Sequence, residues 1–71
     1  MKLLEKVWHV PTIECEGCAR AIHRVLESIA GVCQVEVDLQ QKTVRVVFDA
    51  EQVETEVLQE ALKAAGFPPQ A

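Results

Sequence analysis

Residues 32–49 read VCQVEVDLQQKTVRVVFD, and this stretch decides the fold. Apolar and polar side chains alternate on both sides of a short connection, which is the pattern of two strands that each bury one face. Residues 39–41 are enough for a hairpin loop, so we expect the strands at residues 32–38 and 42–49 to pair antiparallel. The inward faces are expected to carry Cys33, Val35 and Val37 from the first strand and Val44, Val46 and Phe48 from the second.

The segments on either side of this hairpin complete the set of elements. Residues 3–10 predict a strand with Trp8 and Val10 facing the core. Two segments have apolar residues at spacings of three and four, which is typical of amphipathic helices. The first helix is expected over residues 17–29 and ends before Gly31, and the second over residues 51–65, with Gly66 behind it. Their apolar stripes consist of Cys18, Ala21, Ile22, Val25, Leu26 and Ile29, and of Val57, Leu58, Ala61, Leu62 and Ala65.

The order strand, helix, strand, strand, helix predicts an α+β sandwich with both helices on one face of an antiparallel sheet. This is the ferredoxin-like βαββαβ arrangement, built as one domain over residues 1–71. The sequence disfavours the last strand of this order, because Pro68 and Pro69 have no backbone N–H to donate to a neighbouring strand. We therefore expect the fourth strand to be short or absent, which leaves residues 3–10 as an exposed edge.

Length and composition exclude several classes of protein. The chain has 71 residues, 49% hydrophobic and 25% charged, which suits one globular domain. Its net charge of −4 and its three aromatic residues argue against general nucleic-acid binding. No apolar run reaches the roughly 20 residues that cross a bilayer, and Glu5 and Lys6 interrupt the first one. We expect a cytoplasmic protein without direct membrane insertion.

The chemistry concentrates in the segment Thr12-Ile13-Glu14-Cys15-Glu16-Gly17-Cys18. Three cysteines are an odd number for a disulfide framework, which favours metal binding or thiol chemistry. Cys15 and Cys18 stand at a strand-to-helix turn, where the first helical turn brings the two thiols toward one soft ion. The helix N-terminus favours their thiolate forms, whereas the charges of Glu14 and Glu16 oppose ionisation.

The number of ligands narrows the choice of metal. A closed structural zinc site takes four ligands, and this segment offers two cysteines with Glu14 as a further candidate. Cu(I) suits thiolate ligands, and low coordination on an exposed loop leaves space for a sulfur of another protein. We therefore expect a carrier that can pass its ion on. A site that stores its ion would enclose it.

These features resemble the heavy-metal-associated domain family, in particular its small soluble copper chaperones. The resemblance runs through Ile13-Glu14-Cys15-Glu16-Gly17-Cys18, Ile22…Leu26…Ile29-Ala30-Gly31-Val32, Val35-Glu36-Val37-Asp38 and Ala65-Gly66-Phe67. It implies a metallochaperone, not an enzyme, that binds Cu(I) through Cys15 and Cys18. The implied recipient is the metal-binding domain of a copper-transporting P-type ATPase. Glu14 resembles the zinc-type members instead, so zinc or cadmium is the alternative cargo.

The C-x-x-C spacing also admits a different class of function. A glutaredoxin-like oxidoreductase also uses C-x-x-C at a helix start, but no proline stands mid-chain where that fold needs one.

Cys33 is separated from the loop with Cys15 and Cys18 by a whole helix and is interpreted as a core or edge thiol. His9 and His23 are interpreted as solvated. Phe67 either shields the ion or anchors the core. A basic helix face and an acidic second helix suggest docking, and the protein is expected to be a monomer or a metal-bridged homodimer. The basic face comprises Arg20, His23 and Arg24, and the acidic residues are Glu51, Glu54, Glu56 and Glu60.

Overall fold

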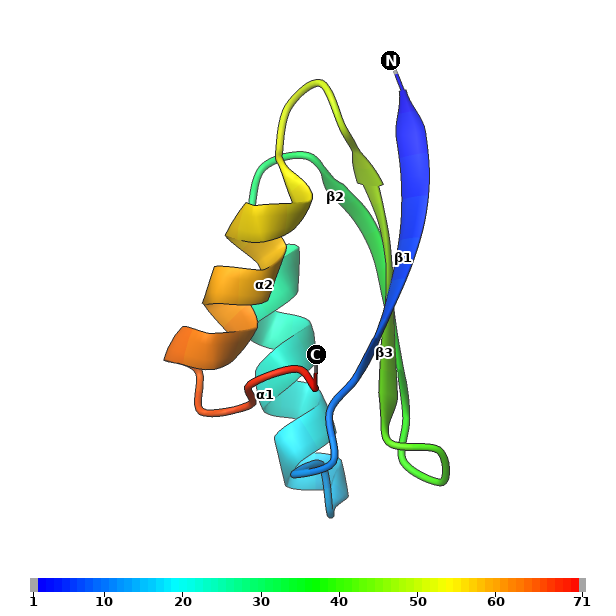
Figure 1. The fold of residues 1–71 in the computed structure, drawn as a ribbon, viewed down its shortest axis with the longest axis vertical. Helices are drawn as coiled ribbons and strands as arrows, with labels where there is room; N and C mark the ends of the chain where they lie inside the picture. The colour runs from blue at the N-terminus through cyan, green and yellow to red at the C-terminus, as the bar shows by residue number, and fades with distance from the viewer. Residues whose placement is uncertain (1, 71) are drawn as a thin grey trace.

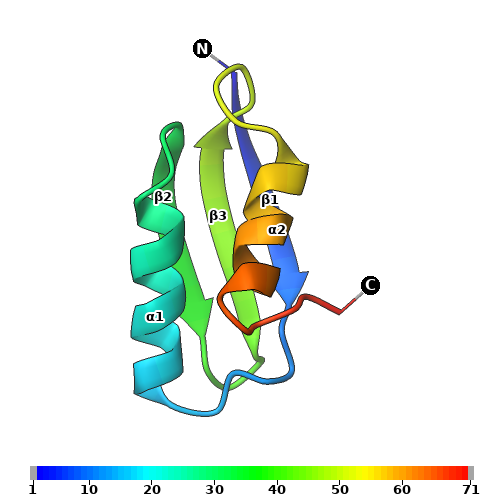
Figure 2. The same ribbon diagram turned by 90° about the vertical axis from the view of Figure 1, so that its left-hand side faces the viewer.

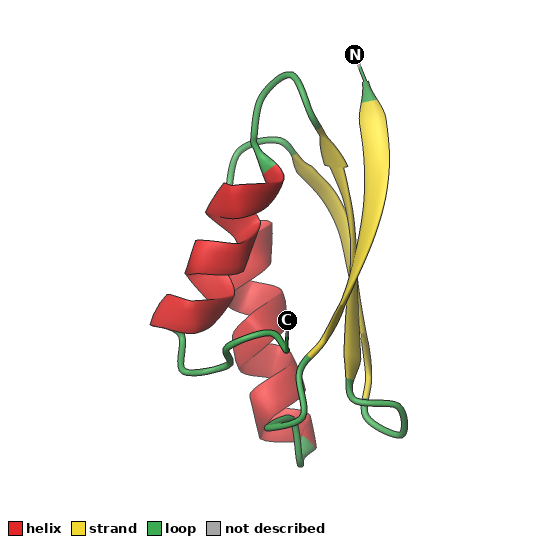
Figure 3. Cartoon of the chain, viewed as in Figure 1, coloured by secondary structure: helices red, strands yellow, loops and turns green. Residues whose placement is uncertain are grey.

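The computed structural model describes residues 2–70 and contains the predicted order of elements (Figures 1 and 3). None of the described helices is long and apolar enough to cross a bilayer. The elements are β1 (Leu3–His9), α1 (Glu16–Glu27), β2 (Val32–Asp38), β3 (Thr43–Asp49) and α2 (Thr55–Ala64).

The three strands form one antiparallel sheet in the order β1-β3-β2. Along β1 the register runs without interruption from Leu3 opposite Asp49 to His9 opposite Thr43. Both helices lie on the same face of the sheet, with α1 nearer β2 and α2 nearer β1 (Figure 2). The prediction of a split βαβ sandwich is confirmed, and residues 2–70 contain no fourth strand.

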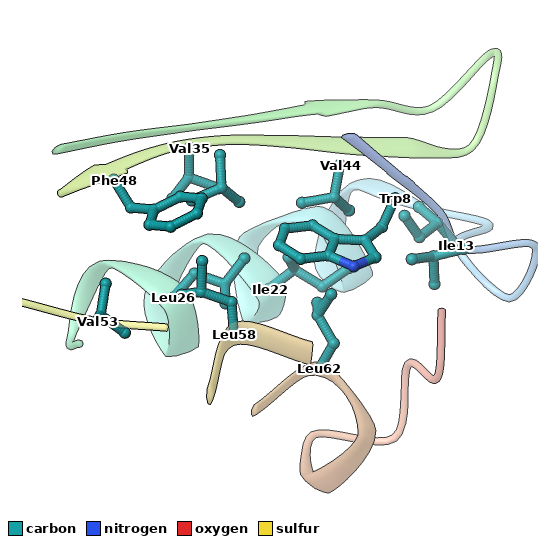
Figure 4. Packing of buried hydrophobic residues seen from close by; sticks show 12 residues of the cluster. Trp8, Ile13, Ile22, Leu26, Val35, Val44, Phe48, Val53, Leu58 and Leu62 are labelled. Carbon is teal, nitrogen blue, oxygen red and sulfur yellow. The ribbon is translucent and has the colours of Figure 1, made fainter. Parts of the chain in front are cut away.

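The core lies between the sheet and the two helices (Figure 4). Trp8 and Val10 are buried, as their strand pattern predicts. Each helix contributes two fully buried side chains four residues apart, because that spacing repeats one face of a helix. These are Ile22 and Leu26 from α1 and Leu58 and Leu62 from α2, and they pack with the sheet residues Val35, Val44, Val46 and Phe48.

A bulge at the start of β2 overturns the predicted inward position of Cys33 and leaves the other interpretation, a thiol on an edge strand. Val32 pairs with Phe48, but the next paired residue, Gln34, is opposite Val47. The bulge adds one residue to the strand, so the alternation seen in the sequence fails there. Cys33 is consequently exposed, with its thiol 3.9 Å from the carbonyl oxygen of Gly31, and it does not share the buried face of Val35.

The second helix begins at Thr55, later than the predicted residue 51, because a turn around Asp49 occupies the intervening segment. The carbonyl oxygen of Asp49 accepts hydrogen bonds from the backbone N–H groups of Gln52 and Val53, both at 3.0 Å. Val57 was predicted in the apolar stripe, but its side chain is 46% exposed, so that assignment is wrong. The inward face of α2 consists of Leu58 and Leu62.

The segment after α2 turns back toward β1. Gly66 has a φ of 90°, the left-handed conformation that lets a helix end. The backbone N–H of Phe67 donates to the carbonyl oxygen of Leu62 at 2.9 Å, and the ring is partly buried against the core. Phe67 therefore anchors the core, one of its two predicted roles. Further on, Gln70 donates its backbone N–H to the carbonyl oxygen of His9 at 2.7 Å.

Candidate metal site

Two fully buried residues, Val10 and Ile13, anchor the loop between β1 and α1 to the core. Val10 donates its backbone N–H to the carbonyl oxygen of Lys42 at 2.8 Å, which ties the end of β1 to the β2–β3 hairpin. Ile13 donates to the carbonyl oxygen of Val10 at 3.2 Å, and its side chain is inserted into the core. The next residues, beginning with Glu14, are consequently held at the surface.

The two thiols lie together on this surface. The Sγ atoms of Cys15 and Cys18 are 3.4 Å apart, with Cys15 exposed and Cys18 half-buried. Cys15 is the N-cap residue of α1 with an extended backbone, and its carbonyl oxygen accepts the backbone N–H of Ala19 at 3.2 Å. Cys18 follows in the first helical turn. The start of the helix thus brings the two sulfurs into contact, as their spacing predicts.

Hydrogen bonds lower the pKa of the Cys15 thiol. The backbone N–H of Cys18 is the largest cause, followed by the thiol of Cys18 and the backbone N–H of Gly17. Partial desolvation and the negative charge of Glu14 act in the opposite direction and raise the pKa. The donors at the helix start outweigh the acidic neighbour, a balance that the sequence left open.

The site supplies two sulfur ligands, which do not fill the coordination sphere of a metal ion. Among residues 2–70, no three His, Cys, Asp or Glu side chains are grouped closely enough to hold a metal ion. Glu14, the candidate additional ligand, is therefore not part of such a group. With metal–sulfur bonds of about 2.3 Å, two sulfurs on one ion lie at most about 4.6 Å apart, so a small rotation of the exposed Cys15 side chain admits an ion. Such an ion would remain open to an additional ligand.

The other predicted residues lie as expected or are already paired. His9 is exposed, and its Nδ1 lies 2.6 Å from Oε1 of Gln70. Nδ1 of His23 contacts a carboxylate oxygen of Glu27 on the outer face of α1, and Arg20 lies 4.0 Å from Glu16. Acidic side chains of the same helix therefore lie beside two members of the basic face of α1.

One supporting contact was missed at the level of sequence. The carbonyl oxygen of Lys42, which holds Val10, comes from a hairpin more than thirty residues further along the chain. A backbone group carries no side-chain pattern, so nothing in the sequence marks it. Only the three-dimensional pairing of β1 with β3 brings it to the metal loop.

Comparison with known proteins decides the family. The sequence profile of the heavy-metal-associated domain matches residues 7–68. The chain belongs to the heavy-metal-associated domain family. Membership in this family favours metal binding over the glutaredoxin-like alternative. The matched residues include the whole loop with Cys15 and Cys18 and all elements from the second half of β1 onward.

Named relatives of this heavy-metal-associated domain handle different metals. The copper chaperone CopZ of Staphylococcus haemolyticus is 34% identical over 65 residues, covering 92% of this chain and 96% of that protein. The periplasmic component of a mercuric transport protein from Shewanella putrefaciens is 36% identical over 59 residues, covering 83% of this chain and 65% of that protein. The crystal structure of a copper binding domain from a P-type ATPase superimposes with a TM-score of 0.85 at 30% identity, covering 99% of this chain and 92% of that one.

Proposed function

We propose that this protein is a copper chaperone that carries Cu(I) on Cys15 and Cys18. The observation that carries the proposal is the pair of accessible sulfurs 3.4 Å apart, with no third grouped ligand in the described part of the chain. Soft thiolates select Cu(I), and two of them suffice for its low coordination. The relationship to a copper chaperone supports the same metal.

The open coordination also suits delivery. An incoming thiolate of a recipient can bond to the ion before the bonds to Cys15 and Cys18 break, so the ion is never released into water. We propose the metal-binding domain of a copper-transporting P-type ATPase as the recipient. Support comes from the shared fold with such a domain. The proposed location is the cytoplasm, where thiols stay reduced.

Cysteine substitutions test the binding site, and the third cysteine provides the control. We expect Cys15→Ser and Cys18→Ser each to abolish tight Cu(I) binding, measured by competition with a chromophoric Cu(I) chelator under reducing conditions. Cys33→Ser removes an exposed thiol outside the loop and should bind Cu(I) like the wild type. Retention of tight binding by the double variant Cys15→Ser/Cys18→Ser would refute the proposed site.

Delivery requires its own experiment. The Cu(I)-loaded protein is mixed with a metal-free metal-binding domain of a copper-transporting P-type ATPase, and the two are separated by ion exchange. We expect copper to distribute between both proteins in the wild type and in Cys33→Ser. If all copper stays with the loaded protein at excess recipient, the transfer function is wrong even where binding is correct.

Zinc or cadmium is the second candidate cargo, and the acidic residue Glu14 directly before Cys15 is the feature that favours it. The described residues do not group Glu14 with the two thiols, so its carboxylate would have to turn toward the ion. A harder oxygen ligand suits Zn(II) better than Cu(I). The comparison is between the wild type and Glu14→Gln, with Zn(II) and Cu(I) affinities measured in parallel. A zinc cargo predicts a loss of Zn(II) affinity in Glu14→Gln with Cu(I) affinity unchanged. Negligible Zn(II) binding in both proteins would eliminate this candidate.

A further inference from the structure

The outer edge of β1 presents backbone groups without a partner strand. The carbonyl oxygen of Lys2 accepts the backbone N–H of Ala50, and Val10 donates to Lys42, so the even-numbered residues point their backbone toward β3 and its flanks. Because this direction alternates along an antiparallel strand, the odd residues point away from β3. In the described part of the chain, only the end of this edge is bonded, where Gln70 meets the carbonyl oxygen of His9.

Apolar side chains gather along the same edge. The described residues include five large hydrophobic side chains that are exposed, and three of them belong to β1: Leu3, Leu4 and Val7. Leu3 and Val7 are 51% and 50% exposed and lie on the sheet face away from the helices, which they share with Arg45. An uncovered strand with apolar side chains is a template for pairing with another strand.

The opposite edge of the sheet lacks this character. β2 has the bulge at Cys33, and polar side chains follow it at Gln34, Glu36 and Asp38. Bulges and charges are the means by which proteins prevent strand addition. β1 also carries two charged residues, Glu5 and Lys6, but it has an uninterrupted register and neither a bulge nor a proline. The two edges therefore differ, and β1 is the one open to addition.

We propose that β1 pairs antiparallel with β1 of a second copy of this chain, around a two-fold axis at Glu5. In this register Leu3 of each copy lies opposite Val7 of the other, and Leu4 lies opposite Lys6. The outward backbone groups of Leu3, Glu5 and Val7 then all find partners. Each exposed apolar side chain on the outer face is covered by an apolar side chain of the other copy.

The alternative registers are less favourable. Centring the axis on Lys6 would place two ammonium groups in the close, non-hydrogen-bonded pair, where Cα atoms are about 4.5 Å apart. Centring it on Val7 would displace Gln70 from His9. The chosen register places the two Glu5 residues in the wider pair, at about 5.5 Å. Arg45 lies diagonally across from Glu5 on the same face and offsets part of that repulsion.

The proposed pair is weak and independent of metal. One five-residue strand from each copy buries less than the roughly 1,200 Å² of a standard interface, so association requires high protein concentration. The metal loop follows the last residue of β1, His9, and antiparallel pairing places the two loops at opposite ends of the joined strands. The cysteines remain free, in contrast to a dimer bridged by a metal ion.

Sedimentation equilibrium of the reduced, metal-free protein from about 10 µM to about 1 mM tests the pairing. We expect the wild type and Cys15→Ser/Cys18→Ser to associate equally. Val7→Glu should weaken association by about tenfold or more, because the lost contact occurs twice in a symmetric pair. Val57→Glu is the matched control: it adds the same charge at a position 46% exposed on α2 and should associate like the wild type.

Two further measurements, association of Glu5→Gln and amide hydrogen exchange of the wild type, test the same pairing if Val7→Glu folds poorly. Glu5→Gln removes the repulsion at the axis and should strengthen association severalfold. Amide hydrogen exchange at Leu3, Glu5 and Val7 should slow as concentration rises. The proposal is overturned by a monomer over the whole range, by equal effects of Val7→Glu and Val57→Glu, or by association that requires the cysteine pair. Copper binding is measured separately, so either hypothesis can fail alone.

Discussion

The side chain of Asp49 accepts a hydrogen bond from the backbone N–H of Lys2 at 3.2 Å. This bond joins the start of β1 to the end of β3, where Leu3 lies opposite Asp49. The same oxygen, Oδ1, accepts the backbone N–H of Glu51 at 3.0 Å. The backbone N–H of Asp49 donates to the carbonyl oxygen of Gly31 at 2.7 Å. The buried residue Asp49 thus links three places: its carboxylate holds the residue before β1 and the turn before α2, and its backbone N–H holds the junction between α1 and β2.

Replacement of this carboxylate should change how stability depends on pH. The N–H groups of Glu51 and Lys2 lower the pKa of Asp49 below its ordinary value of 3.8. The ionised form therefore stabilises the fold above pH 3.8, and this contribution is lost as the pH falls through the lower folded pKa. We expect Asp49→Asn to lower the melting temperature at pH 7, with a smaller difference from wild type near pH 3. Glu60→Gln controls for the lost charge, and a pH-independent difference would contradict the prediction.

Two glycines with positive φ should respond differently to alanine. Gly66 has open space around it, so Gly66→Ala meets only the conformational cost, about 1–2 kcal/mol. At Gly31 (φ 99°) a Cβ atom would lie 3.0 Å from both Gln52 Cβ and Val53 Cγ1. Crowding adds to the backbone cost, and we expect about 2–4 kcal/mol for Gly31→Ala. Urea denaturation of both variants measures the difference, and equal losses would exclude a role for crowding.

Two neighbouring residues on α2, Val57 and Leu58, should differ in how much stability is lost when each is replaced by alanine. Leu58 is fully buried, so Leu58→Ala leaves a cavity and should cost about 2–5 kcal/mol. Val57 is half exposed, and Val57→Ala should change stability by less than about 0.5 kcal/mol. Chemical denaturation of the pair checks which face of the helix is buried. A larger loss of stability for Val57→Ala than for Leu58→Ala would contradict this prediction and indicate that Val57 is buried, as the sequence pattern predicts.

Glu14 should tune the reactivity of Cys15. Its negative charge raises the pKa of the Cys15 thiol against the hydrogen bonds that lower it. Glu14→Gln is therefore expected to lower this pKa further and shift the pH dependence of Cys15 alkylation toward lower pH. Peptide-resolved mass spectrometry of the iodoacetamide reaction measures the shift in a Cys33→Ser background. Glu60→Gln, far along the chain, should leave the profile unchanged, and a shift toward higher pH in Glu14→Gln would contradict the electrostatic explanation.

Periodicity predicts most of this fold because its elements are short and each buries one face. Val44, Val46 and Phe48 are buried as their alternation indicates, and Cys15 and Cys18 meet as their spacing indicates. The alternation pattern alone places Cys33 on the inward face, which is wrong, because a bulge depends on how two strands pair and not on one strand's pattern. The late start of α2 likewise depends on hydrogen bonds to the carbonyl oxygen of Asp49. The sequence could not show this, because the acidic residues that precede α2 are also typical of the first turn of a helix.

The strand pairing has a consequence for synthesis. β2 and β3 are joined by a four-residue turn at residues 39–42, whereas Leu3 must wait for Asp49 before its pairing can form. Local pairs close early and distant pairs close late. At ordinary translation speeds the delay is on the order of seconds. A nascent chain therefore leaves the ribosome with its cysteine loop accessible before the sheet that supports the loop exists.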